Sequence, residues 1–441
     1  MRISIIGSGH VGLVTGACFA ELGNSVVCVD NDERKIKILK KGEVPFYEPG
    51  LEEMVRTNME EGRLEFTSSI SEGIRKAKVV FICVGTPALP SGKVDLSAVE
   101  KVSKSIGESL TEYKVIVEKS TVPVKTGEKV ERILRRTVKN RVKFDVASNP
   151  EFLREGSAIK DFLQPDRIII GVSSRKASSI LVELYEPLSA PILITDIKSA
   201  ELIKHASNAF LAMKISFINA VANLCDLAGA DIKKVAKGVG LDKRIGESFF
   251  EAGVGYGGSC FPKDVSAFLH IANELGYDFT LLKEVEKINH YQRERVIKDL
   301  EEFLGKLEGK TIGILGLAFK PFTDDIRESP AIDIVKMLKE KGTKIKAHDP
   351  QAMNTFSSLF SDIEYLSDPY EVARGSEALV ILTSWPQYHH LNLKKIKELL
   401  AFPLIVDGRN ILDPAKASNA GLYYSSIGRG KLGHKTLNPK L

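Results

Sequence analysis

The first thirty residues carry the pattern that most limits how this chain can fold. A short apolar run at residues 3–6 is followed at once by the sequence GSGHVG at residues 7–12. Residues 11–22 then have the composition of a helix, and a second apolar run at residues 24–29 ends at Asp30. Strand, glycine turn, helix, strand and acid in this order predict a βαβ unit of the dinucleotide-binding type.

Strand-like and helix-like segments go on alternating through the first part of the chain. Apolar, strand-like runs recur, with helical patterns between them, at residues 79–84, 115–118, 145–148 and 167–171. Alternation of this kind is typical of a parallel, doubly wound sheet with helices on both faces.

The middle of the chain has a different composition. Residues 197–230 are rich in Ala, Leu, Ile, Asn and Lys and contain no proline, which predicts one long helix. A helical pattern continues over residues 231–308, interrupted by a glycine-rich loop. By analogy, an unusually long helix between two α/β units is often the spine of a dimer, so we expect a homodimer or a higher homo-oligomer.

The opening pattern returns near Lys310. A strand, a turn, a helix and a further strand follow in that order at residues 311–315, 316–320, 331–341 and 344–348. The predicted fold class is therefore α/β, with two Rossmann-like doubly wound units flanking a central all-helical section with one long helix. The second unit lacks the full glycine fingerprint, so it should bind a nucleotide differently or bind nothing. The predicted domains are a cofactor-binding unit at residues 1–196, a central helical domain at 197–308, a second Rossmann-like unit at 309–427 and a flexible basic tail at 428–441.

Composition excludes several classes of protein. The 441 residues include five cysteines, an odd number with no CxxC pair, which argues against a disulfide framework and a zinc site, so no metal is expected. The formal net charge of +5 is small and spread along the chain, so nucleic acid is not an expected partner. Met1-Arg2 runs straight into a strand, and no segment approaches the roughly 20 apolar residues of a membrane span. We therefore expect a cytoplasmic protein without a membrane partner.

The glycines at residues 7–12 match the G-x-G-x-x-G spacing. The first allows the tight turn, the second lets the backbone approach a pyrophosphate, and the third lets the helix pack closely on the strand. Asp30 can accept hydrogen bonds from both ribose hydroxyls and would repel a 2′-phosphate, which favours NAD over NADP. A glycine turn without a ligand is the alternative. Gly85-Thr86 and Ser120-Thr121 end later strands, at the sheet edge where ligands bind in such folds.

A glycine-rich loop at residues 253–260 ends in Cys260 and is followed by Lys263. Nearby backbone amides and a cation favour the thiolate form of a cysteine. A thiolate can add to an aldehyde, which gives a thiohemiacetal, and loss of hydride then gives a thioester that water cleaves. A buried structural thiol is the alternative for Cys260, and it is the expected state of the cysteines in apolar runs, Cys18, Cys28, Cys83 and Cys225.

The chain resembles the UDP-glucose/GDP-mannose dehydrogenase family from its N-terminus to about Arg409. The matching strings are GSGHVG at 7–12, STVP at 120–123, NPEFLREG at 149–156, Lys204 with Asn208, GYGGSCFPKD at 255–264, GLAFK at 316–320 and RES at 327–329. The resemblance implies NAD-dependent, four-electron oxidation of UDP-glucose to UDP-glucuronate, with the UDP-sugar held by the unit at residues 309–427.

The resemblance also implies roles for individual residues. Catalytic roles fall to Cys260, Lys204, Asn208, Asp264, Glu151 and Thr121. Cofactor contacts fall to Gly7, Gly9, His10, Val11, Gly12, Asp30, Lys35, Gly85, Thr86, Thr121, Glu155, Lys263 and Arg327. Substrate contacts fall to Glu151, Phe152, Leu153, Lys204, Asn208, Arg244, Phe249, Gly253, Tyr256, Gly257, Phe319, Lys320 and Arg409.

Several alternatives stay open at this point. From the residues alone, Lys204 and Lys35 are equally well explained as surface charges, and Glu155 as an ordinary charge at the start of a helix. Glu251 stands where some relatives carry a cation, so a contact there is in doubt. The same chemistry on GDP-mannose or a UDP-N-acetylhexosamine is a second hypothesis for function. A two-electron hydroxyacid dehydrogenase and a non-catalytic nucleotide sensor are less favoured, because neither needs Cys260.

Overall fold

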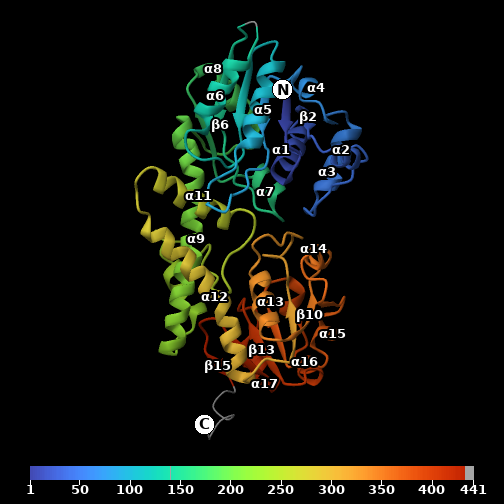
Figure 1. Cartoon of the computed structure of the whole chain (residues 1–441), viewed down its shortest axis with the longest axis vertical. Helices are drawn as coiled ribbons and strands as arrows, with labels where there is room; N and C mark the ends of the chain where they lie inside the picture. Colours follow the sequence, from blue (N-terminus) through green and yellow to red (C-terminus); the bar gives the residue numbers. More distant parts are fainter. Residues whose placement is uncertain (140, 433–441) are drawn as a thin grey trace. The chain divides into compact units, whose positions relative to one another are not determined.

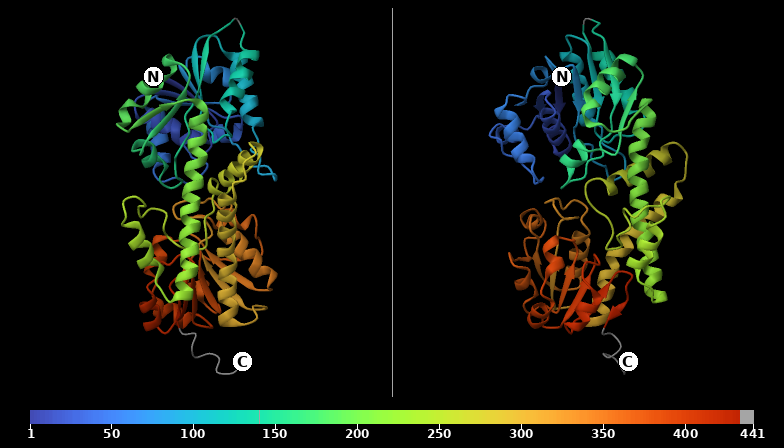
Figure 2. Two further views of the ribbon diagram at one scale, coloured as in Figure 1. Left: turned by 90° about the vertical axis from the view of Figure 1, so that its left-hand side faces the viewer. Right: turned by 180° about the vertical axis from the view of Figure 1, so that it is seen from behind.

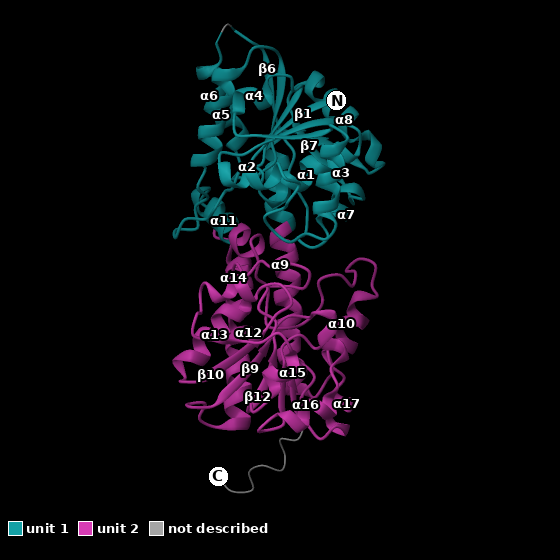
Figure 3. Cartoon of the chain, turned by 90° about the vertical axis from the view of Figure 1, so that its right-hand side faces the viewer, with its two compact units in different colours: residues 1–207, 266–277 teal, residues 208–265, 278–441 magenta. Residues whose placement is uncertain are grey.

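The computed structural model describes residues 1–139 and 141–432 (Figure 1). The chain forms two compact units, each built around its own sheet (Figure 3). The first unit is residues 1–207 with 266–277, and the second is residues 208–265 with 278–441. The predicted central helical section is thus divided between the two units by its packing.

An eight-stranded sheet forms the centre of the first unit, in the order β3-β2-β1-β4-β5-β6-β7-β8. Its strands are β1 Arg2–Ile6, β2 Ser25–Val29, β3 Leu64–Thr67, β4 Val79–Ile82, β5 Lys114–Glu118, β6 Phe144–Ser148, β7 Ile168–Val172 and β8 Ile192–Thr195. The strand order reverses between β1 and β4, and ligands bind outside the carboxyl ends of the strands at such a switch point.

One strand pair departs from the predicted parallel sheet. β6 and β7 are antiparallel, with Ala147 opposite Val172 and Ser148 opposite Gly171. The helix between them, α7 Ala158–Leu163, has six residues. The connection does not return the chain to the edge where β6 began, so β7 starts at the edge where β6 ends and the two strands run in opposite directions.

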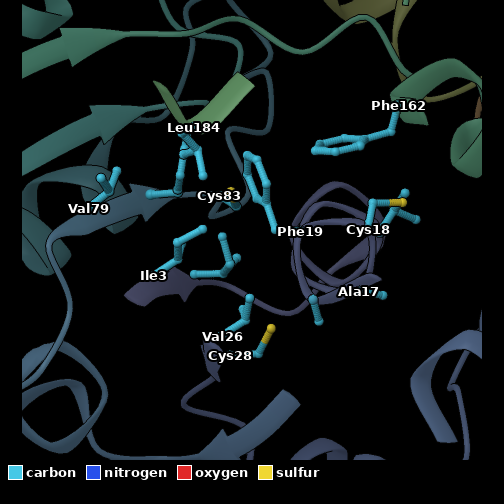
Figure 4. Close-up of a cluster of buried hydrophobic side chains, with 14 of the residues drawn as sticks. Ile3, Ala17, Cys18, Phe19, Val26, Cys28, Val79, Cys83, Phe162 and Leu184 are labelled. Carbon is cyan, nitrogen blue, oxygen red and sulfur yellow. The ribbon is translucent and has the colours of Figure 1, made fainter. Parts of the chain in front are cut away.

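Helices cover both faces of this sheet, which explains why β4 and β5 are buried over their whole lengths. The helices are α1 His10–Glu21, α2 Glu33–Leu39, α3 Leu51–Glu60, α4 Ile70–Ile74, α5 Ser97–Ser109, α6 Thr126–Thr137, α7, α8 Arg175–Tyr185 and the 3-10 helix η1 Glu186–Leu188. Phe19 of α1 packs against Phe162 edge to face, at a ring separation of 5.0 Å (Figure 4). Cys18, Cys28 and Cys83 lie buried in the same core, as predicted.

A seven-stranded sheet forms the centre of the second unit, in the order β11-β10-β9-β12-β13-β14-β15. Its strands are β9 Thr311–Leu315, β10 Lys344–His348, β11 Glu364–Tyr365, β12 Ala378–Ile381, β13 Leu404–Asp407, β14 Tyr423–Ser426 and β15 Lys431–Leu432. Its helices are α13 Pro330–Glu340, α14 Met353–Ser357, α15 Pro369–Ala373, the 3-10 helix η2 Pro386–His390, α16 Leu393–Leu399 and α17 Pro414–Asn419. The order β9, turn, α13, β10 repeats the order that opens the chain, so the predicted internal echo is present.

Four helices lie in the predicted helical section: α9 Ile197–Ala228, α10 Ile232–Gly240, α11 Phe261–Glu274 and α12 Thr280–Leu304. α9 is one continuous helix of 32 residues (Figure 2). By length and composition alone it could cross a membrane, which the sequence analysis did not foresee. However, buried Ser216 donates to the carbonyl of Val285, and buried Asn219 accepts from the amide of Gly253. These polar contacts attach the second half of the helix to the second unit.

The end of the described chain is ordered further than predicted. β15 pairs antiparallel with β14, and the amides of Gly428 and Gly430 donate to the carboxylate of Asp226 at 3.0 and 2.9 Å. The predicted tail at residues 428–441 therefore contributes its first five residues to the second unit. Residues 433–441 lie outside the described part of the chain.

Candidate functional site

The glycine fingerprint connects β1 to α1, and its three glycines meet different surroundings. A Cβ atom on Gly7, which has a φ of 100°, would lie 2.6 Å from the carbonyl oxygen of Cys83. A Cβ on Gly12 would lie 1.8 Å from the carbonyl oxygen of Gly7. A Cβ on Gly9 would meet nothing within 4 Å. Gly7 and Gly12 are therefore needed for packing, whereas Gly9 leaves room for a ligand at the N-terminus of α1. This arrangement fits the pyrophosphate of a dinucleotide.

Asp30 follows β2, and its carboxylate lies beside the fingerprint. It accepts hydrogen bonds from the amides of Ser8 at 2.8 Å and Asp32 at 3.0 Å, and from the ammonium of Lys35 at 2.9 Å. Burial opposes ionisation, but these hydrogen bonds outweigh it and hold the pKa of Asp30 below its ordinary value. The charged carboxylate suits ribose hydroxyls and would repel a 2′-phosphate, so the donor set fits NAD. Lys35, whose side chain is 28% exposed, is thus paired with Asp30, and its contact with the ribose stays a prediction.

His10, the first residue of α1, is linked to a loop that is distant in sequence. Its Nε2 lies 2.8 Å from the carboxylate of Glu48. Glu48 also accepts from the amides of Gly156 at 2.6 Å and Ala158 at 2.9 Å. The turn that carries Glu155 is therefore held to the fingerprint helix. Glu48 was not predicted as a site residue, because its partners lie 38 to 110 residues away in the sequence.

The residues that follow β4 and β5 lie across the switch point from the fingerprint. The hydroxyl of Thr86 donates to the carbonyl of Thr121 at 2.9 Å, and the hydroxyl of Ser120 donates to the carbonyl of Val84 at 2.8 Å. A Cβ on Gly85 would meet nothing within 4 Å, so space is open beside these loops. The structure thus brings the predicted residues Thr86 and Thr121 together.

Glu151, just after β6, forms a buried ion pair with Lys204 on α9. The Lys204 ammonium lies 3.1 Å from Glu151 Oε1, and each side chain is only 5% exposed. The other carboxylate oxygen accepts from the amide of Leu153 at 2.7 Å. The ring of Phe152 lies 5.2 Å from the ammonium. Lys204 is therefore not a surface charge, and that alternative was wrong.

A second buried cation lies next to this pair and was not predicted. The ammonium of Lys119 donates to the side-chain oxygen of Asn149 at 2.9 Å, and the hydroxyl of Tyr185 donates to the same oxygen. Burial lowers the pKa of Lys119 to about 8, although the nearby acidic groups Cys83 and Glu151 oppose the change. The contacts hold Asn149, the first residue of the NPEFLREG string, at the end of β6.

In the second unit, Cys260 immediately precedes α11. It is partly exposed, whereas Cys18, Cys28, Cys83 and Cys225 are buried, so a sealed structural thiol does not describe it. Its carbonyl accepts the amide of Asp264 in the first turn of the helix at 2.8 Å.

Asp264 lies almost fully buried in that first turn. One carboxylate oxygen accepts from the side-chain amide of Asn208 on α9 at 2.5 Å, and the other accepts from the ammonium of Lys263 at 2.6 Å. The structure thus brings Asn208, Lys263 and Asp264 together in the second unit, and Lys204 and Glu151 together in the first. Lys204 and Asn208 are carried by the same helix, one turn apart.

The glycines before Cys260 allow the loop to pack closely against its neighbours, which was not predicted from the sequence. A Cβ on Gly257 would lie 2.1 Å from the carbonyl oxygen of Glu328. A Cβ on Gly258, at a φ of 87°, would lie 2.6 Å from the ring of Phe319. The backbone of the loop therefore lies tightly against the segment between β9 and α13. These glycines are explained by close approach, so their number is weaker support for a reactive thiol than we inferred.

Arg409, after β13, joins three loops of the second unit. Its guanidinium donates to the carbonyls of Leu382 at 2.7 Å, Gly255 at 3.2 Å and Phe319 at 3.4 Å. Burial, with Arg293 nearby, lowers its pKa to about 10, so the group stays charged at neutral pH. The predicted substrate residues Gly253 to Gly257, Phe319, Lys320 and Arg409 thus lie in neighbouring loops.

The remaining predicted residues differ in their contacts. Arg244 is 87% exposed and pairs with Asp242 two residues away. The carbonyl of Arg327 accepts from the amide of Gly258 at 2.9 Å, and its guanidinium pairs with Asp325. The ring of Phe249 lies 6.2 Å from the ring of Phe261, the residue after Cys260. Glu251 is exposed, and nothing in the structure explains it.

Asp349 follows β10 in the second unit as Asp30 follows β2 in the first, but the contacts of the two carboxylates differ. Its Oδ2 accepts from the amides of Leu317 at 2.7 Å and Ala318 at 3.1 Å, as Asp30 accepts from Ser8. The indole of Trp385 donates to the same oxygen at 3.1 Å, and Asp349 is fully buried. No ribose can reach this carboxylate, so the second unit cannot bind a nucleotide as the first does. In the described part of the chain, no group of three His, Cys, Asp or Glu side chains is placed to hold a metal.

In the first unit, the glycine fingerprint at the switch point, the charged Asp30 beside it and the buried lysine–glutamate pair fit a nicotinamide-dependent oxidoreductase as the class of protein. Comparison with known proteins places the chain more narrowly. The NAD binding domain, central domain and UDP binding domain of one family match residues 1–189, 198–291 and 313–414. The chain belongs to the UDP-glucose/GDP-mannose dehydrogenase family.

Similar proteins cover nearly the whole chain. UDP-glucose 6-dehydrogenase TuaD of Bacillus subtilis is 50% identical over 97% of this chain and 93% of its own length. UDP-glucose 6-dehydrogenase of Pseudomonas aeruginosa is 45% identical over 98% of this chain and 99% of its own. The solved structure of a UDP-glucose dehydrogenase from Pyrobaculum islandicum is 41% identical, with a TM-score of 0.91 over 97% of both chains.

Proposed function

We propose that this protein oxidises UDP-glucose to UDP-glucuronate in two successive NAD-dependent steps. Family membership supports the class of reaction, and the UDP-glucose 6-dehydrogenases named above support the sugar nucleotide. The main support for a four-electron reaction is the partial exposure of Cys260, the one cysteine of the described residues that is not buried. A cysteine at the site gives the half-oxidised sugar a covalent anchor.

In the first oxidation the 6-hydroxyl of the sugar loses its proton while carbon 6 loses hydride, and an aldehyde results. Bound NAD supplies the hydride acceptor in each oxidation. We assign the stabilisation of developing negative charge on the sugar oxygen to the Lys204 ammonium and the Asn208 amide. The buried ion pair with Glu151 orients Lys204, and the hydrogen bond to Asp264 orients Asn208.

In the second oxidation the thiolate of Cys260 adds to the aldehyde carbon, and the carbonyl oxygen takes up the proton released in the first oxidation to become the hydroxyl of a thiohemiacetal. Loss of hydride from carbon 6 and of the hydroxyl proton gives a thioester. Water then attacks the thioester carbon, Glu151 accepts a proton from that water, and the sulfur leaves as thiolate. The products are the carboxylate and the free cysteine, so two hydrides leave for each sugar consumed.

The test is to count NADH formed per UDP-glucose consumed. We expect two for the wild-type protein. Cys260→Ser should form at most one NADH per sugar and should not complete turnover to the acid, whereas Cys225→Ser, at a buried cysteine, should still give two. Full four-electron turnover by Cys260→Ser would remove the thiol from the mechanism. GDP-mannose and UDP-N-acetylglucosamine belong in the same assay, and faster oxidation of either would replace UDP-glucose in the proposal.

We also propose a cytoplasmic homodimer that forms through α9. Apolar side chains at heptad spacing, Phe210, Phe217 and Leu224, are 57%, 54% and 63% exposed on this helix. Burying such a stripe between two copies removes apolar surface from water. Phe217→Glu should convert the dimer to a monomer in size-exclusion chromatography with light scattering. Leu275→Glu, at an exposed leucine of the first unit, should leave the dimer unchanged. A monomeric wild-type protein would overturn this proposal.

A further inference from the structure

The first three turns of α9 hold the loop between β5 and α6. Glu201 is 2% exposed, and its two carboxylate oxygens accept from the amides of Lys125 at 2.6 Å and Gly127 at 2.7 Å. One turn further along α9, Nε2 of His205 lies 2.8 Å from the carbonyl oxygen of Val122. A carbonyl oxygen only accepts, so His205 carries a proton on Nε2 and donates it. Three hydrogen bonds from one helix thus hold this loop.

The geometry of the loop explains why a carboxylate is used. Lys125 is the N-cap of α6, it has a φ of 77°, and its side chain does not cap the helix. The free amides at the start of α6 carry positive charge from the helix dipole, which an anion stabilises. A Cβ on Gly127 would lie 2.5 Å from Ile197 of α9, so the two helices approach too closely for any side chain there. Glu201 therefore caps α6 from a neighbouring helix across a tight contact.

The same part of the chain carries residues to which we assign the chemistry. Lys204 lies between Glu201 and His205 on α9 and pairs with Glu151. Thr121 lies at the start of the held loop, and its carbonyl accepts from Thr86. Glu201 and His205, which contact the loop, therefore flank Lys204 in the sequence of α9.

We infer that Glu201 is a positioning residue for the oxidation: its ionised carboxylate fixes the loop at residues 121–127 against α9, and so holds Thr121 in register with Lys204. The inference rests on the proposed function, which assigns these two residues to the site. It adds a residue that does not itself touch substrate or cofactor.

The ionisation state of Glu201 makes this contact sensitive to pH. Burial raises the pKa of Glu201 to about 7, against the two amide hydrogen bonds that lower it. The charged groups that face it are Glu128 and Lys198, which pair with each other at 2.7 Å, and the buried Glu118. Below about pH 7 the carboxyl gains a proton, and one of the two amides loses a full acceptor. We expect the hydrogen bonds from the Lys125 and Gly127 amides to Glu201 to weaken as the pH falls below about 7.

The main test compares Glu201→Gln with Glu131→Gln, a matched change at an exposed glutamate of α6. A misplacement of about 1 Å can cost about 100-fold in rate, so we expect kcat of Glu201→Gln to fall by about 10- to 100-fold. The Km for UDP-glucose should change little. The decline of wild-type activity between pH 8 and 6 should be flattened in Glu201→Gln, because its side chain does not titrate. Glu131→Gln should match the wild type.

A second measurement stands independently of whether the variant folds. Peptide-resolved hydrogen exchange of residues 119–130 in the wild-type protein, corrected for intrinsic rates, should show less protection at pH 6 than at pH 8. Equal protection, or a Glu201→Gln protein with wild-type kcat and pH profile, would overturn the inference. Failure of the proposed function gives a different result: a wild-type protein that forms no NADH from UDP-glucose but still shows the pH-dependent protection.

Discussion

The buried ion pair between Lys204 and Glu151 leads to the sharpest stability prediction. Both side chains are 5% exposed, and the ammonium lies 3.1 Å from the carboxylate. Lys204→Met keeps the length of the side chain and its apolar stem but removes the charge. The carboxylate of Glu151 then stays buried without its main partner.

The expected cost follows from the burial of the pair. Removing one partner of a buried ion pair costs about 3–5 kcal/mol. Because the amide of Leu153 still donates to Glu151 and the Lys119 ammonium lies nearby, we expect a loss at the lower end of this range, about 3 kcal/mol at pH 7.

The assay is denaturant unfolding of the wild type, Lys204→Met, Glu151→Gln and the double variant at pH 7. The chain has one tryptophan, Trp385, which lies in the second unit. Its fluorescence therefore reports the second unit, while circular dichroism reports both units. The circular dichroism transition should move in Lys204→Met, and the fluorescence transition should move less.

The double variant supplies the control. It leaves no uncompensated charge, so it should recover most of the stability that Lys204→Met loses while it stays inactive. Residues in one ion pair typically couple by about 0.5–3 kcal/mol. If the two single changes are additive within about 0.5 kcal/mol, the two side chains do not interact as a buried pair and the reasoning is refuted.

Three further predictions concern the cofactor side and the core. Gly12→Ala should lower the thermal denaturation midpoint, because its Cβ would lie 1.8 Å from the carbonyl oxygen of Gly7. Gly9→Ala should keep the wild-type midpoint, because its Cβ would meet nothing within 4 Å, but calorimetry should show weaker NAD binding. Asp30→Asn should weaken NAD binding and reduce the preference for NAD over NADP, and an unchanged ratio of kcat/KM values would contradict the assignment. Burial raises the pKa of Glu118 to about 8, above its unfolded value, so its ionisation costs stability as the pH rises from about 5 to 8. Glu118→Gln should therefore be more stable than the wild type at pH 8 by about 1–3 kcal/mol and similar at pH 5, and denaturant midpoints at both pH values check this.

Much of the fold could be predicted from the sequence, because it depends on local patterns. The long helix was predicted over residues 197–230 and is found over Ile197–Ala228. The second Rossmann-like unit was predicted from a strand, turn, helix and strand after Lys310, and the sheet order confirms it. The reversed strand β7 was missed, because the local pattern of an apolar strand is the same in parallel and antiparallel pairs.

The partners of individual side chains could be predicted only in part. Lys204 could not be told from a surface lysine by its neighbours in sequence, because its partner lies 53 residues away. Glu48, Lys119 and Glu201 were missed for the same reason. The glycines before Cys260 were read as amide donors, and their close contacts with Glu328 and Phe319 became visible only in the folded chain.

The amino-acid sequence by itself determined which segments become strands and helices, where the fingerprint turn lies and which sequence motifs of the family are present. These properties follow from the period of apolar residues and from the backbone freedom of glycine, which act over a few residues. Only the tertiary structure decided which charges are buried and paired, which carboxylates cap distant loops and which acid is covered by Trp385. Those outcomes depend on groups that meet across tens of residues, where burial raises the cost of an unpaired charge and thereby selects its partner.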